Sequence, residues 1–560
     1  MNTKPVCLAL LVASLSACAQ TPTTEGAAPV LPPQGLTAQM FYQFLLGEIA
    51  GQRGELKLSA EAYADLAAKT RDPRVARRAT EVALYARQSA LAIRNASLWL
   101  ELDPDSPKAM QTLASLLVAS GRLAEAKPHL ASWIKTGKGG EIFLQMHGMF
   151  AKQKDRQAVL DLVSDLAAPY PGVPEARFAV GQAAWQAGQV QKSLEALTEA
   201  LRLKPDWESA VLFRAQVLQK QAGNEAVLAY LKDYLATHPA AQDVRMTYAK
   251  QLARAGNFNE SRVQFEQMTR DNPDNPESYF AVGLVAMQTN DLDSAKASFM
   301  KALDLGHPDP DGVRMYLGQL AEARGQWVDA LTWYKSVEKS RAQFDAQNRV
   351  AVVLGKLGRV GEARAWLAGL TPSSDGEKVQ LAQTEAQVLR ESKDYEGVFN
   401  VLSKALEKMP DSPDLLYDRA MAAEKVNRLD ALEKDLRKLI KLKPDYAHAY
   451  NALGYTLADR TNRIPEALEL LEKALKLEPD DPFILDSMGW ALVKAKRYGE
   501  AVDYLRRAYG TKPDPEIAAH YGEALWMKGD KDEARKVWKS GLQTHPDSES
   551  LREVASRLMP

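Results

Sequence analysis

The chain contains few side chains whose type and spacing could support catalysis. Ser132 with Lys135, and Ser336 with Lys339, match the pattern Ser-x-x-Lys, in which a lysine one helical turn away can activate a serine as a nucleophile. A motif with only two specified residues at helical spacing arises by chance in a chain so rich in helical patterns. We therefore predict no catalytic role for either pair.

Other catalytic patterns are missing from the sequence. Its seven histidines are scattered, without a His-Glu-x-x-His metal motif or carboxylates clustered at ligand spacing. It has no Gly-x-Ser-x-Gly motif and no glycine-rich phosphate loop ending in Gly-Lys-Ser/Thr. His448 and His520 are expected to lie on helix surfaces rather than to serve as ligands or bases. The sequence thus predicts a protein that is not an enzyme and that needs no metal or cofactor.

The elements that organise the chain are helical repeats, which are clearest in residues 447–546. Three copies of one unit follow each other there, each with small residues at fixed positions and a closing proline. The recurring positions are Gly454, Gly489 and Gly522; Ala467, Ala501 and Ala534; and Pro479, Pro513 and Pro546. This is the tetratricopeptide repeat (TPR) pattern, a helix–turn–helix of about 34 residues.

The repeat spacing has a physical reason. Two antiparallel helices approach closely only where a small residue lies at their crossing. Large apolar residues such as Leu453, Leu457 and Leu471 recur at three- and four-residue steps and form one buried stripe. One copy cannot bury this stripe alone, so the copies must stack. We predict an all-α fold, a TPR superhelical solenoid of about 15 helix–turn–helix pairs.

Breaks in the repeat pattern divide the chain. We expect degenerate TPR pairs in residues 37–136, a central TPR array in 141–370, and a C-terminal array with a capping helix in 377–560. The segments TGKGG at 136–140 and GLTPSSDGE at 369–377 are the predicted joints. The formal net charge of −1 gives no electrostatic case for a nucleic-acid partner.

Residues 1–18 have the features of a targeting segment. A positive start at Lys4 precedes an apolar run too short to span a bilayer, and the segment ends in Leu-Ser-Ala before Cys18. This ending resembles the bacterial lipobox, in which the cysteine is lipidated; the alternative is an ordinary secretory peptide. The resemblance implies a lipid anchor at Cys18, and Ala19 after it implies the outer membrane, with the protein facing the periplasm.

Residues 19–36 are rich in proline, threonine, glycine and alanine and show no periodicity, so we expect a flexible tether. Fully extended, the tether could reach roughly 55–60 Å, which would let the folded part work away from the membrane. Lipidation of Cys18 and loss of Cys7 with the signal peptide would leave the mature chain without a thiol to pair.

The first helix of each TPR pair lines the groove of a TPR superhelix, so its groove positions are candidate contacts for a partner protein. They form an aromatic and methionine-rich set with a few polar members: Phe178, Trp185, Met246, Phe280, Met287, Met315, Tyr455, Phe483, Trp490 and Trp526, with Asp459, Asp486, Lys494 and Glu523. Such a face suits protein segments, because aromatic side chains bury large areas and methionine adapts its shape. The alternative is that the aromatic residues fill gaps between neighbouring helices.

A basic cluster precedes the clear repeats and consists of Arg71, Arg74, Arg77, Arg78 and Arg87. It is either a solvated helix face or a contact for an acidic partner or anionic headgroups. The groove does not match the TPR type that clamps a C-terminal carboxylate, because Tyr455 stands where that type needs a second asparagine after Asn451.

Two blocks of sequence are more particular than the repeat pattern. One is the opening FYQFLLGEIAGQRGEL with AEAYADLAAKTRDPRVARRATEVALYAR, and the other is the closing HAYNALGYTLADR with DPFILDSMGWAL and DPEIAAHYGEALW. Together with the lipobox, they resemble outer-membrane TPR lipoproteins of the LbcA type, which are adaptors of a periplasmic carboxyl-terminal processing protease.

The resemblance implies a scaffold that binds this protease and presents protein substrates to it, notably hydrolases that cut peptidoglycan cross-links. A TPR lipoprotein scaffold in outer-membrane protein assembly or polysaccharide export is the alternative, since such roles also use periplasmic TPR solenoids. An enzyme with a site hidden in the solenoid is disfavoured by the lack of clustered nucleophiles, metal ligands or paired carboxylates.

Overall fold

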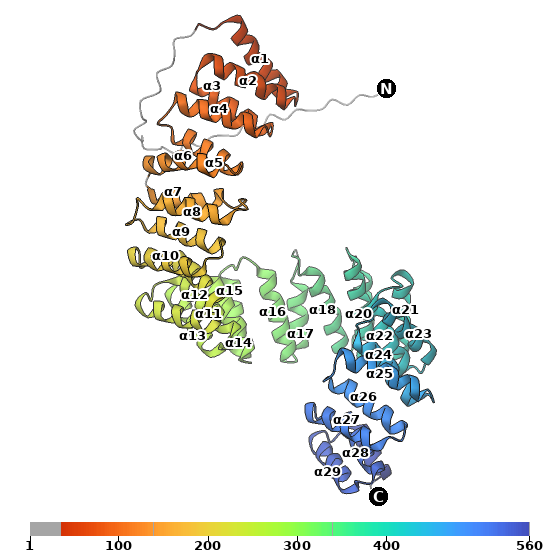
Figure 1. Cartoon of the computed structure of the whole chain (residues 1–560). Coiled ribbons are helices and arrows are strands. Elements are labelled where there is room, and N and C mark those ends of the chain that lie inside the picture. The colour runs from red at the N-terminus through yellow and green to blue at the C-terminus, as the bar shows by residue number, and fades with distance from the viewer. Residues whose placement is uncertain (1–34, 138, 339, 559–560) are drawn as a thin grey trace, which may run out of the picture. The chain divides into compact units, whose positions relative to one another are not determined.

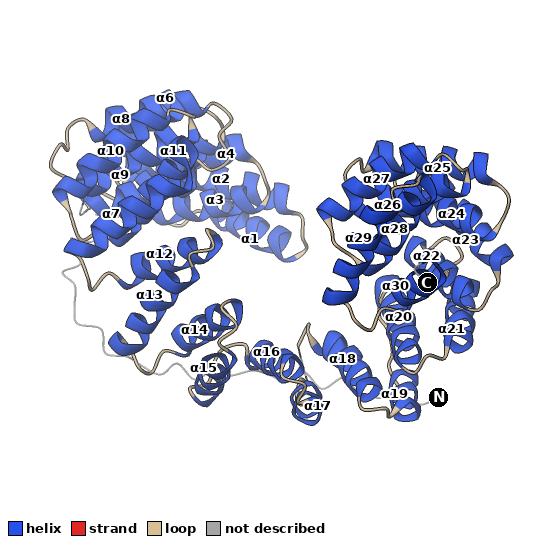
Figure 2. Cartoon of the chain, turned by 90° about the horizontal axis from the view of Figure 1, so that it is seen from below, coloured by secondary structure: helices blue, strands red, loops and turns tan. Residues whose placement is uncertain are grey.

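The computed structural model describes residues 35–137, 139–338 and 340–558. Every regular element within these residues is an α-helix, and this part of the chain contains no strand (Figure 2). The predicted signal peptide, the lipidation site Cys18 and most of the tether 19–36 lie outside the described residues.

The chain forms two compact units, of which unit 1 ends at Met268 and unit 2 begins at Thr269. The helices of unit 1 follow one another along the chain (Figure 1): α1 (Ala38–Gln52), α2 (Leu56–Thr70), α3 (Pro73–Tyr85), α4 (Ser89–Leu102), α5 (Pro107–Ala119), α6 (Leu123–Thr136), α7 (Gly139–Met149), α8 (Arg156–Ala167), α9 (Pro174–Gln186), α10 (Val190–Leu203), α11 (Glu208–Thr237), α12 (Gln242–Arg254) and α13 (Phe258–Asp271), in which the division falls.

Unit 2 continues the same alternation of helices and short turns. Its helices are α14 (Pro276–Gln288), α15 (Leu292–Asp304), α16 (Pro310–Ala323), α17 (Trp327–Lys335), α18 (Gln343–Lys356), α19 (Val360–Ala368), α20 (Asp375–Glu391), α21 (Tyr395–Lys408), α22 (Pro413–Lys425), α23 (Leu429–Leu442), α24 (Ala447–Arg460), α25 (Ile464–Leu477), α26 (Pro482–Lys494), α27 (Tyr498–Thr511), α28 (Pro515–Lys528), α29 (Lys531–Thr544) and α30 (Glu549–Leu558).

Consecutive helices form pairs in both units. Helix α11 contains one non-helical residue, Gly223, with φ 78° and ψ −168°, which separates two helices at a kink. With α11 taken as two helices, the described residues contain fifteen helix–turn–helix pairs, and α30 follows the last one. The predicted all-α architecture of about 15 TPR pairs is confirmed.

The predicted small residues lie where paired helices cross. A Cβ atom on Gly454 would lie 2.7 Å from Cγ of Leu471, and a Cβ atom on Gly522 would lie 2.1 Å from Nε1 of Trp538. Both separations are shorter than a van der Waals contact, so only glycine lets α24 approach α25, and α28 approach α29, this closely. Leu471 and Trp538 are fully buried as a result.

Proline and aspartate set the starts of the first helices. Pro482 and Pro515 occupy the first turns of α26 and α28, where their missing N–H group leaves no hydrogen bond unmade. Asp481 and Asp514, directly before them, cap these helices by accepting backbone N–H groups of the first turn. In these two repeats, the proline and the aspartate before it determine where the first helix begins.

Helices are interrupted at both predicted joints. Helix α6 ends at Thr136 and α7 begins at Gly139, while α19 ends at Ala368 and α20 begins at Asp375. The second interruption is shorter than the predicted 369–377, because the hydroxyl of Ser374 accepts the backbone N–H of Glu377 and caps α20.

Candidate protein-binding surfaces

Helices α24, α26 and α28 are the first helices of three successive pairs, and each contacts the next. Their side chains form one connected set, which we call the first-helix face: Tyr455, Asp459, Asp486, Trp490, Lys494 and His520. The contact of α24 with α26, and of α26 with α28, follows from the stacking of repeats. It brings together residues that lie about one repeat apart in the sequence.

Asp459 is the polar centre of one half of the first-helix face. Its Oδ1 atom accepts a hydrogen bond from Nε1 of Trp490 at 3.0 Å and lies 3.0 Å from Nζ of Lys494. The Lys494 ammonium also lies 4.7 Å from the centre of the Trp490 ring. Burial acts to raise the pKa of Asp459, but the hydrogen bonds from Trp490 and Lys494 outweigh it and hold the pKa below its usual value.

His520 is the centre of the other half, and it is buried. Its Nδ1 lies 2.9 Å from Oδ2 of Asp486, and its ring stacks on Trp490 with centroids 4.2 Å apart and planes at 18°. The Tyr455 ring lies 6.3 Å away. Burial acts to lower the pKa of His520, but the neighbouring Asp486 carboxylate outweighs it and raises the pKa.

The expectation that His520 lies on a helix surface is therefore wrong. The stacking of α26 on α28 covers the imidazole, and Asp486 supplies the charge partner that makes its burial tolerable. The sequence contained a signal for this: an acidic residue and a histidine 34 residues apart, close to one repeat length, on successive first helices.

Tyr455 and Trp490 both lie beside His520, and both are half-buried, so each keeps part of its ring accessible. Phe483 lies apart from them at the start of α26, is 44% exposed, and has Nζ of Lys512 4.3 Å from its ring centre. Trp526 packs on Trp538 within its own repeat, with centroids 5.8 Å apart.

Glu523, predicted among the polar groove residues, forms an ion pair with Arg557 of α30 at 2.7 Å. The connected polar and aromatic network of the first-helix face thus contains Asp459, Asp486 and Lys494, whereas Glu523 is engaged by the final helix.

The predicted contacts of the earlier repeats pack mainly between helices. Phe178 is buried against Trp207, with centroids 4.6 Å apart. Phe280 is half-buried, and its ring lies 4.7 Å from that of His307. Trp185 and Met287 are half-buried beside the cores of their repeats. Phe178 thus fills a gap between helices, the alternative that the sequence left open.

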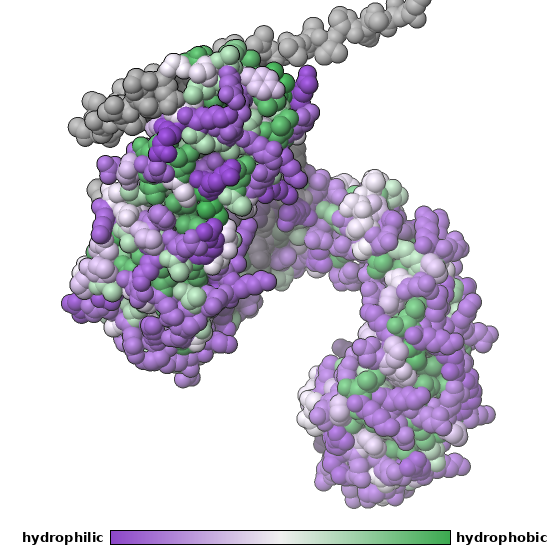
Figure 3. All heavy atoms as spheres, turned by 45° about the horizontal axis from the view of Figure 1, so that its top comes forward, coloured by the Kyte–Doolittle hydropathy of each residue, from purple (hydrophilic) through white to green (hydrophobic). Residues whose placement is uncertain are grey.

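A second surface, in unit 1, is strongly apolar. It consists of exposed side chains on α1, α2 and α3, which we call the N-terminal apolar surface: Phe41, Tyr42, Phe44, Leu45, Ile49, Leu58, Leu84 and Tyr85. Green, hydrophobic residues reach the surface at this end of unit 1 in Figure 3. A groove of about 660 Å³ lies beside them, lined by residues of the same three helices.

The repeat pattern predicted degenerate TPR pairs in residues 37–136 but did not predict the N-terminal apolar surface. The available signal was the composition of α1, AQMFYQFLLGEIAGQ, in which Glu48 is the one charged residue. A helix that is apolar on nearly every side has to be covered on nearly every side. As the first helix described, α1 packs on α2 through Gly47 and Ala50, and several of its apolar side chains are not covered by other described residues.

The basic cluster is largely ion-paired. Arg71 pairs with Glu101, Arg74 with Asp72, Arg77 with Glu81 and Arg78 with Glu48. All these arginine side chains remain more than half exposed. The charges of four of the five arginines are thus balanced by neighbouring carboxylates on the same unit.

His448 lies at the surface, as expected. Its Nε2 is 3.9 Å from Oε2 of Glu478, and potential ligand atoms of His448, Glu478 and Asp481 lie within 4.8 Å of one another. One carboxylate oxygen of Asp481 already accepts the backbone N–H groups of Phe483 and Ile484. The proximity of these three residues therefore follows from the way α25 ends and α26 begins.

The two Ser-x-x-Lys pairs show no catalytic arrangement among the described residues. Ser132 and Lys135 are both exposed on α6, and no hydrogen bond joins them. The Ser336 hydroxyl donates to the backbone carbonyl of Trp333 at 2.6 Å, and Lys339 lies outside the described residues. None of the described helices is long and apolar enough to cross a bilayer.

Comparison with known families and sequences consistently finds tetratricopeptide repeat proteins. The tetratricopeptide repeat family model matches residues 157–207, 247–310, 281–343, 417–482 and 487–549. A TPR repeat-containing protein of Pseudomonas aeruginosa is 34% identical over 484 residues, which cover 86% of this chain and 82% of that protein. TPR repeat-containing protein YpiA of Bacillus subtilis is 22% identical over 293 residues, 45% of this chain and 67% of its own.

Solved structures that resemble this chain superpose on it with low TM-scores. A tetratricopeptide repeat protein from Parabacteroides merdae is 15% identical, covers 51% of this chain and 99% of its own, and superposes with a TM-score of 0.36. A structure of Naa15/Naa10 bound to HypK-THB is 13% identical and covers 93% of this chain and 96% of its own, with a TM-score of 0.34.

Proposed function

Because this chain belongs to the tetratricopeptide repeat family, we propose that it is a non-catalytic scaffold that brings two proteins together. The observation that carries the proposal is a pair of contact surfaces with different chemistry. The first-helix face of unit 2 combines half-buried aromatic rings with charged groups, whereas the N-terminal apolar surface of unit 1 consists of exposed aromatic and aliphatic side chains. Two partners with different surfaces could therefore bind the same chain.

Each surface has the composition of a protein contact. Exposed apolar areas of this kind on a folded protein mark interaction sites, because leaving them in water is unfavourable. Tryptophan and tyrosine contribute strongly to interfaces, since they bury a large area with few rotatable bonds. The hydrogen-bonded Trp490 is already held in place by Asp459, so little entropy is lost when a partner covers it.

The specific function that we propose is that of an adaptor for a periplasmic carboxyl-terminal processing protease. One surface would hold the protease, and the other would hold protein substrates such as hydrolases of peptidoglycan cross-links. A lipid at Cys18 would confine the complex to the inner leaflet of the outer membrane. Confinement raises the concentration of each partner near the other, so cleavage is accelerated without any catalytic group on the scaffold.

The test is capture of partners from envelope extract by a chain that starts at Ala19 and carries no lipid, with captured proteins identified by mass spectrometry. Trp490→Ala should remove one partner class, with an affinity loss of about 2 kcal/mol or roughly 30-fold. Phe41→Ser with Tyr42→Ser should remove the other. Val328→Ser is the matched control, because Val328 is an exposed apolar residue of α17 outside both surfaces.

Recovery of a processing protease together with cell-wall hydrolases would support the adaptor. Recovery of outer-membrane assembly or polysaccharide-export components would exclude the protease and leave a scaffold of another kind. Cleavage of a captured protein by the purified chain alone would contradict the non-catalytic role.

A further inference from the structure

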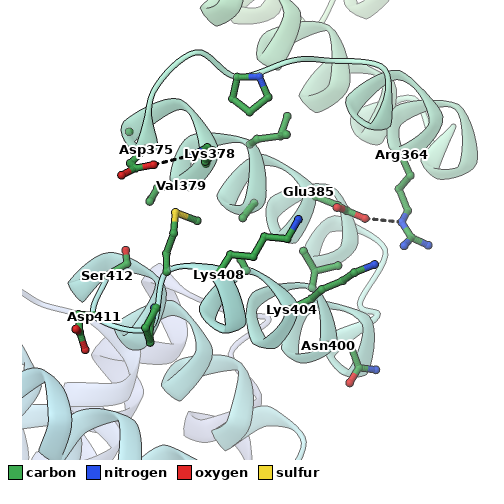
Figure 4. Close-up of a pocket in the computed structure, with 18 residues that line it drawn as sticks. Arg364, Asp375, Lys378, Val379, Glu385, Asn400, Lys404, Lys408, Asp411 and Ser412 are labelled. Atoms are coloured by element: carbon green, nitrogen blue, oxygen red, sulfur yellow. Dashed lines mark hydrogen bonds and ion pairs between the residues drawn. The ribbon is translucent and has the colours of Figure 1, made fainter.

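A groove of about 1010 Å³ lies over α19, α20 and α21 in unit 2 (Figure 4). Arg364 of α19 stands at one end, and Asp411, in the loop after α21, stands at the other. The groove shares no lining residue with the first-helix face or the N-terminal apolar surface. It is a third surface that the proposed function does not use.

The groove exists because α19 is short. Helix α19 has 9 residues, whereas each second helix that follows it, from α21 to α29, has 14. Pro372 cannot continue a helix, and the chain runs as a loop until Ser374 caps α20. Helix α19 is thus five residues shorter than these helices, which corresponds to about 7.5 Å of helix. The shorter helix leaves the first half of α20 and the second half of α21 uncovered.

The floor of the groove is apolar. Val379 and Ala382 of α20, Val401 and Ala405 of α21, and Met409 pack on the buried core with one side and line the groove with the other. All five are half-buried. A full-length α19 would cover such residues, so the floor offers apolar area that a bound segment can remove from water.

The carboxylates that line the groove are all neutralised. Each has a basic partner within ion-pair distance: Glu385 with Arg364 at 2.9 Å, Asp375 with Lys378 at 2.8 Å and Asp411 with Lys438 at 2.8 Å. These pairs leave no negative charge free to attract a basic ligand.

Two lysines of the groove differ from the other charged groups. Lys404 and Lys408 lie one helical turn apart on α21, both exposed, and neither forms an ion pair with a described residue. In Figure 4 no dashed line joins either lysine to another of the residues drawn. The uncompensated charge beside the apolar floor is therefore positive.

We propose that this groove binds an acidic segment of a partner protein. Apolar side chains of the segment cover Val379, Val401 and Met409, while its carboxylates pair with Lys404 and Lys408. A nucleic acid fits less well, because single strands bind through stacking on aromatic side chains and none of the described residues that line the groove is aromatic. The ion pairs between the segment and the two lysines make binding selective for acidic segments, and the apolar floor contributes most of the buried area.

The experiment is a selection of short random peptides displayed on phage against the chain from Ala19, with the variant K404E/K408E used for counter-selection. Enriched peptides should carry aspartate or glutamate beside leucine, isoleucine, valine or phenylalanine. Their affinity, measured by fluorescence anisotropy, should fall at least about tenfold in K404E/K408E and should also fall with added salt.

Three variants make the result specific. K473E/K476E reverses two exposed lysines of α25 outside the groove and should leave the affinity unchanged. Asn400→Trp places a large ring in the groove from an exposed position and should weaken binding without disturbing the core. Trp490→Ala should have no effect, so loss of the proposed adaptor function and loss of this groove can be told apart.

The proposal is overturned if no selected peptide distinguishes the wild-type chain from K404E/K408E, or if Asn400→Trp leaves peptide binding intact. It is also overturned if vesicles of phosphatidylglycerol bind through Lys404 and Lys408 and no peptide competes with them, because the groove would then recognise lipid headgroups. Circular dichroism of each variant verifies that the fold is retained.

Discussion

Nδ1 of His520 and Oδ2 of Asp486 lie 2.9 Å apart, in the buried part of the first-helix face. The two residues come from the first helices of successive repeats, so their contact links α26 to α28. Trp490 covers one side of the imidazole. A buried ion pair of this kind makes the chain sensitive to loss of either charge, because the remaining charge would stay buried without compensation.

The stability of unit 2 should therefore fall as pH rises. Burial acts to lower the pKa of His520, but Asp486 outweighs it, and the pKa in the folded chain lies above the unfolded value of about 6.5. The stabilisation is complete below about pH 6.5 and is lost as pH rises through the folded-state pKa. Urea unfolding followed by circular dichroism should show a lower free energy of unfolding near pH 9 than near pH 6.

Asp486→Asn is the control for this pH dependence, because it removes the charge and keeps the size of the side chain. It should cost about 2 kcal/mol near pH 6, the typical worth of a hydrogen bond to a charged group. Near pH 9 the variant and the wild-type chain should differ less. Equal dependence of stability on pH in both proteins would exclude His520 as the responsible group.

Much of the fold could be predicted from the sequence, because the recurring residues of the repeat have strong effects on the local backbone and on helix packing. Gly454 and Gly522 mark close helix crossings, and Pro482 and Pro515 mark helix starts. The burial of His520 could not be read from its own helix. It depends on Asp486 of the repeat before it, and helical periodicity within one helix carries no information about that neighbour.

The open surfaces were also hard to predict. An apolar residue such as Phe41 gives the same helical pattern whether or not a neighbouring helix covers it, so the pattern alone does not show that this side chain is exposed. The groove beside Lys404 results from the early end of α19. The sequence showed the interruption at Pro372 as a joint but gave no indication of the groove that the shortened helix leaves.

Gly522→Ala tests the close crossing of α28 and α29. The new Cβ atom would meet Trp538, which is fully buried and cannot move aside, so we expect a loss of about 1–3 kcal/mol in the free energy of unfolding. Gly510→Ala is the matched control, because Gly510 lies in α27 with no atom within 4 Å of the added Cβ. It should stabilise the chain by up to about 1 kcal/mol. Equal effects of the two substitutions would contradict the close crossing.

Substitutions at Arg419 and Asp435 test how much a second buried ion pair contributes to the free energy of unfolding. Two guanidinium nitrogens of Arg419 lie 2.7 Å from the two oxygens of Asp435, whose side chain is 2% exposed. Arg419→Met should cost about 3–5 kcal/mol in urea unfolding, because it leaves the carboxylate buried without a partner. Adding Asp435→Leu should recover most of that loss. A double variant much less stable than the wild-type chain would show that the pair itself stabilises the fold.

The N-terminal apolar surface should be dispensable for folding but needed for binding. Phe41 and Tyr42 are 49% and 64% exposed, so Phe41→Ser with Tyr42→Ser should change the free energy of unfolding by no more than about 0.5 kcal/mol. The same pair should reduce binding of a fluorescent hydrophobic dye and abolish capture of one partner. Leu66→Ser is the contrasting variant: Leu66 is buried in α2, and its replacement should cost about 2–5 kcal/mol. If the Phe41 and Tyr42 variant lost as much stability as Leu66→Ser, these rings would be part of the core, and unit 1 would offer no free apolar surface to a partner.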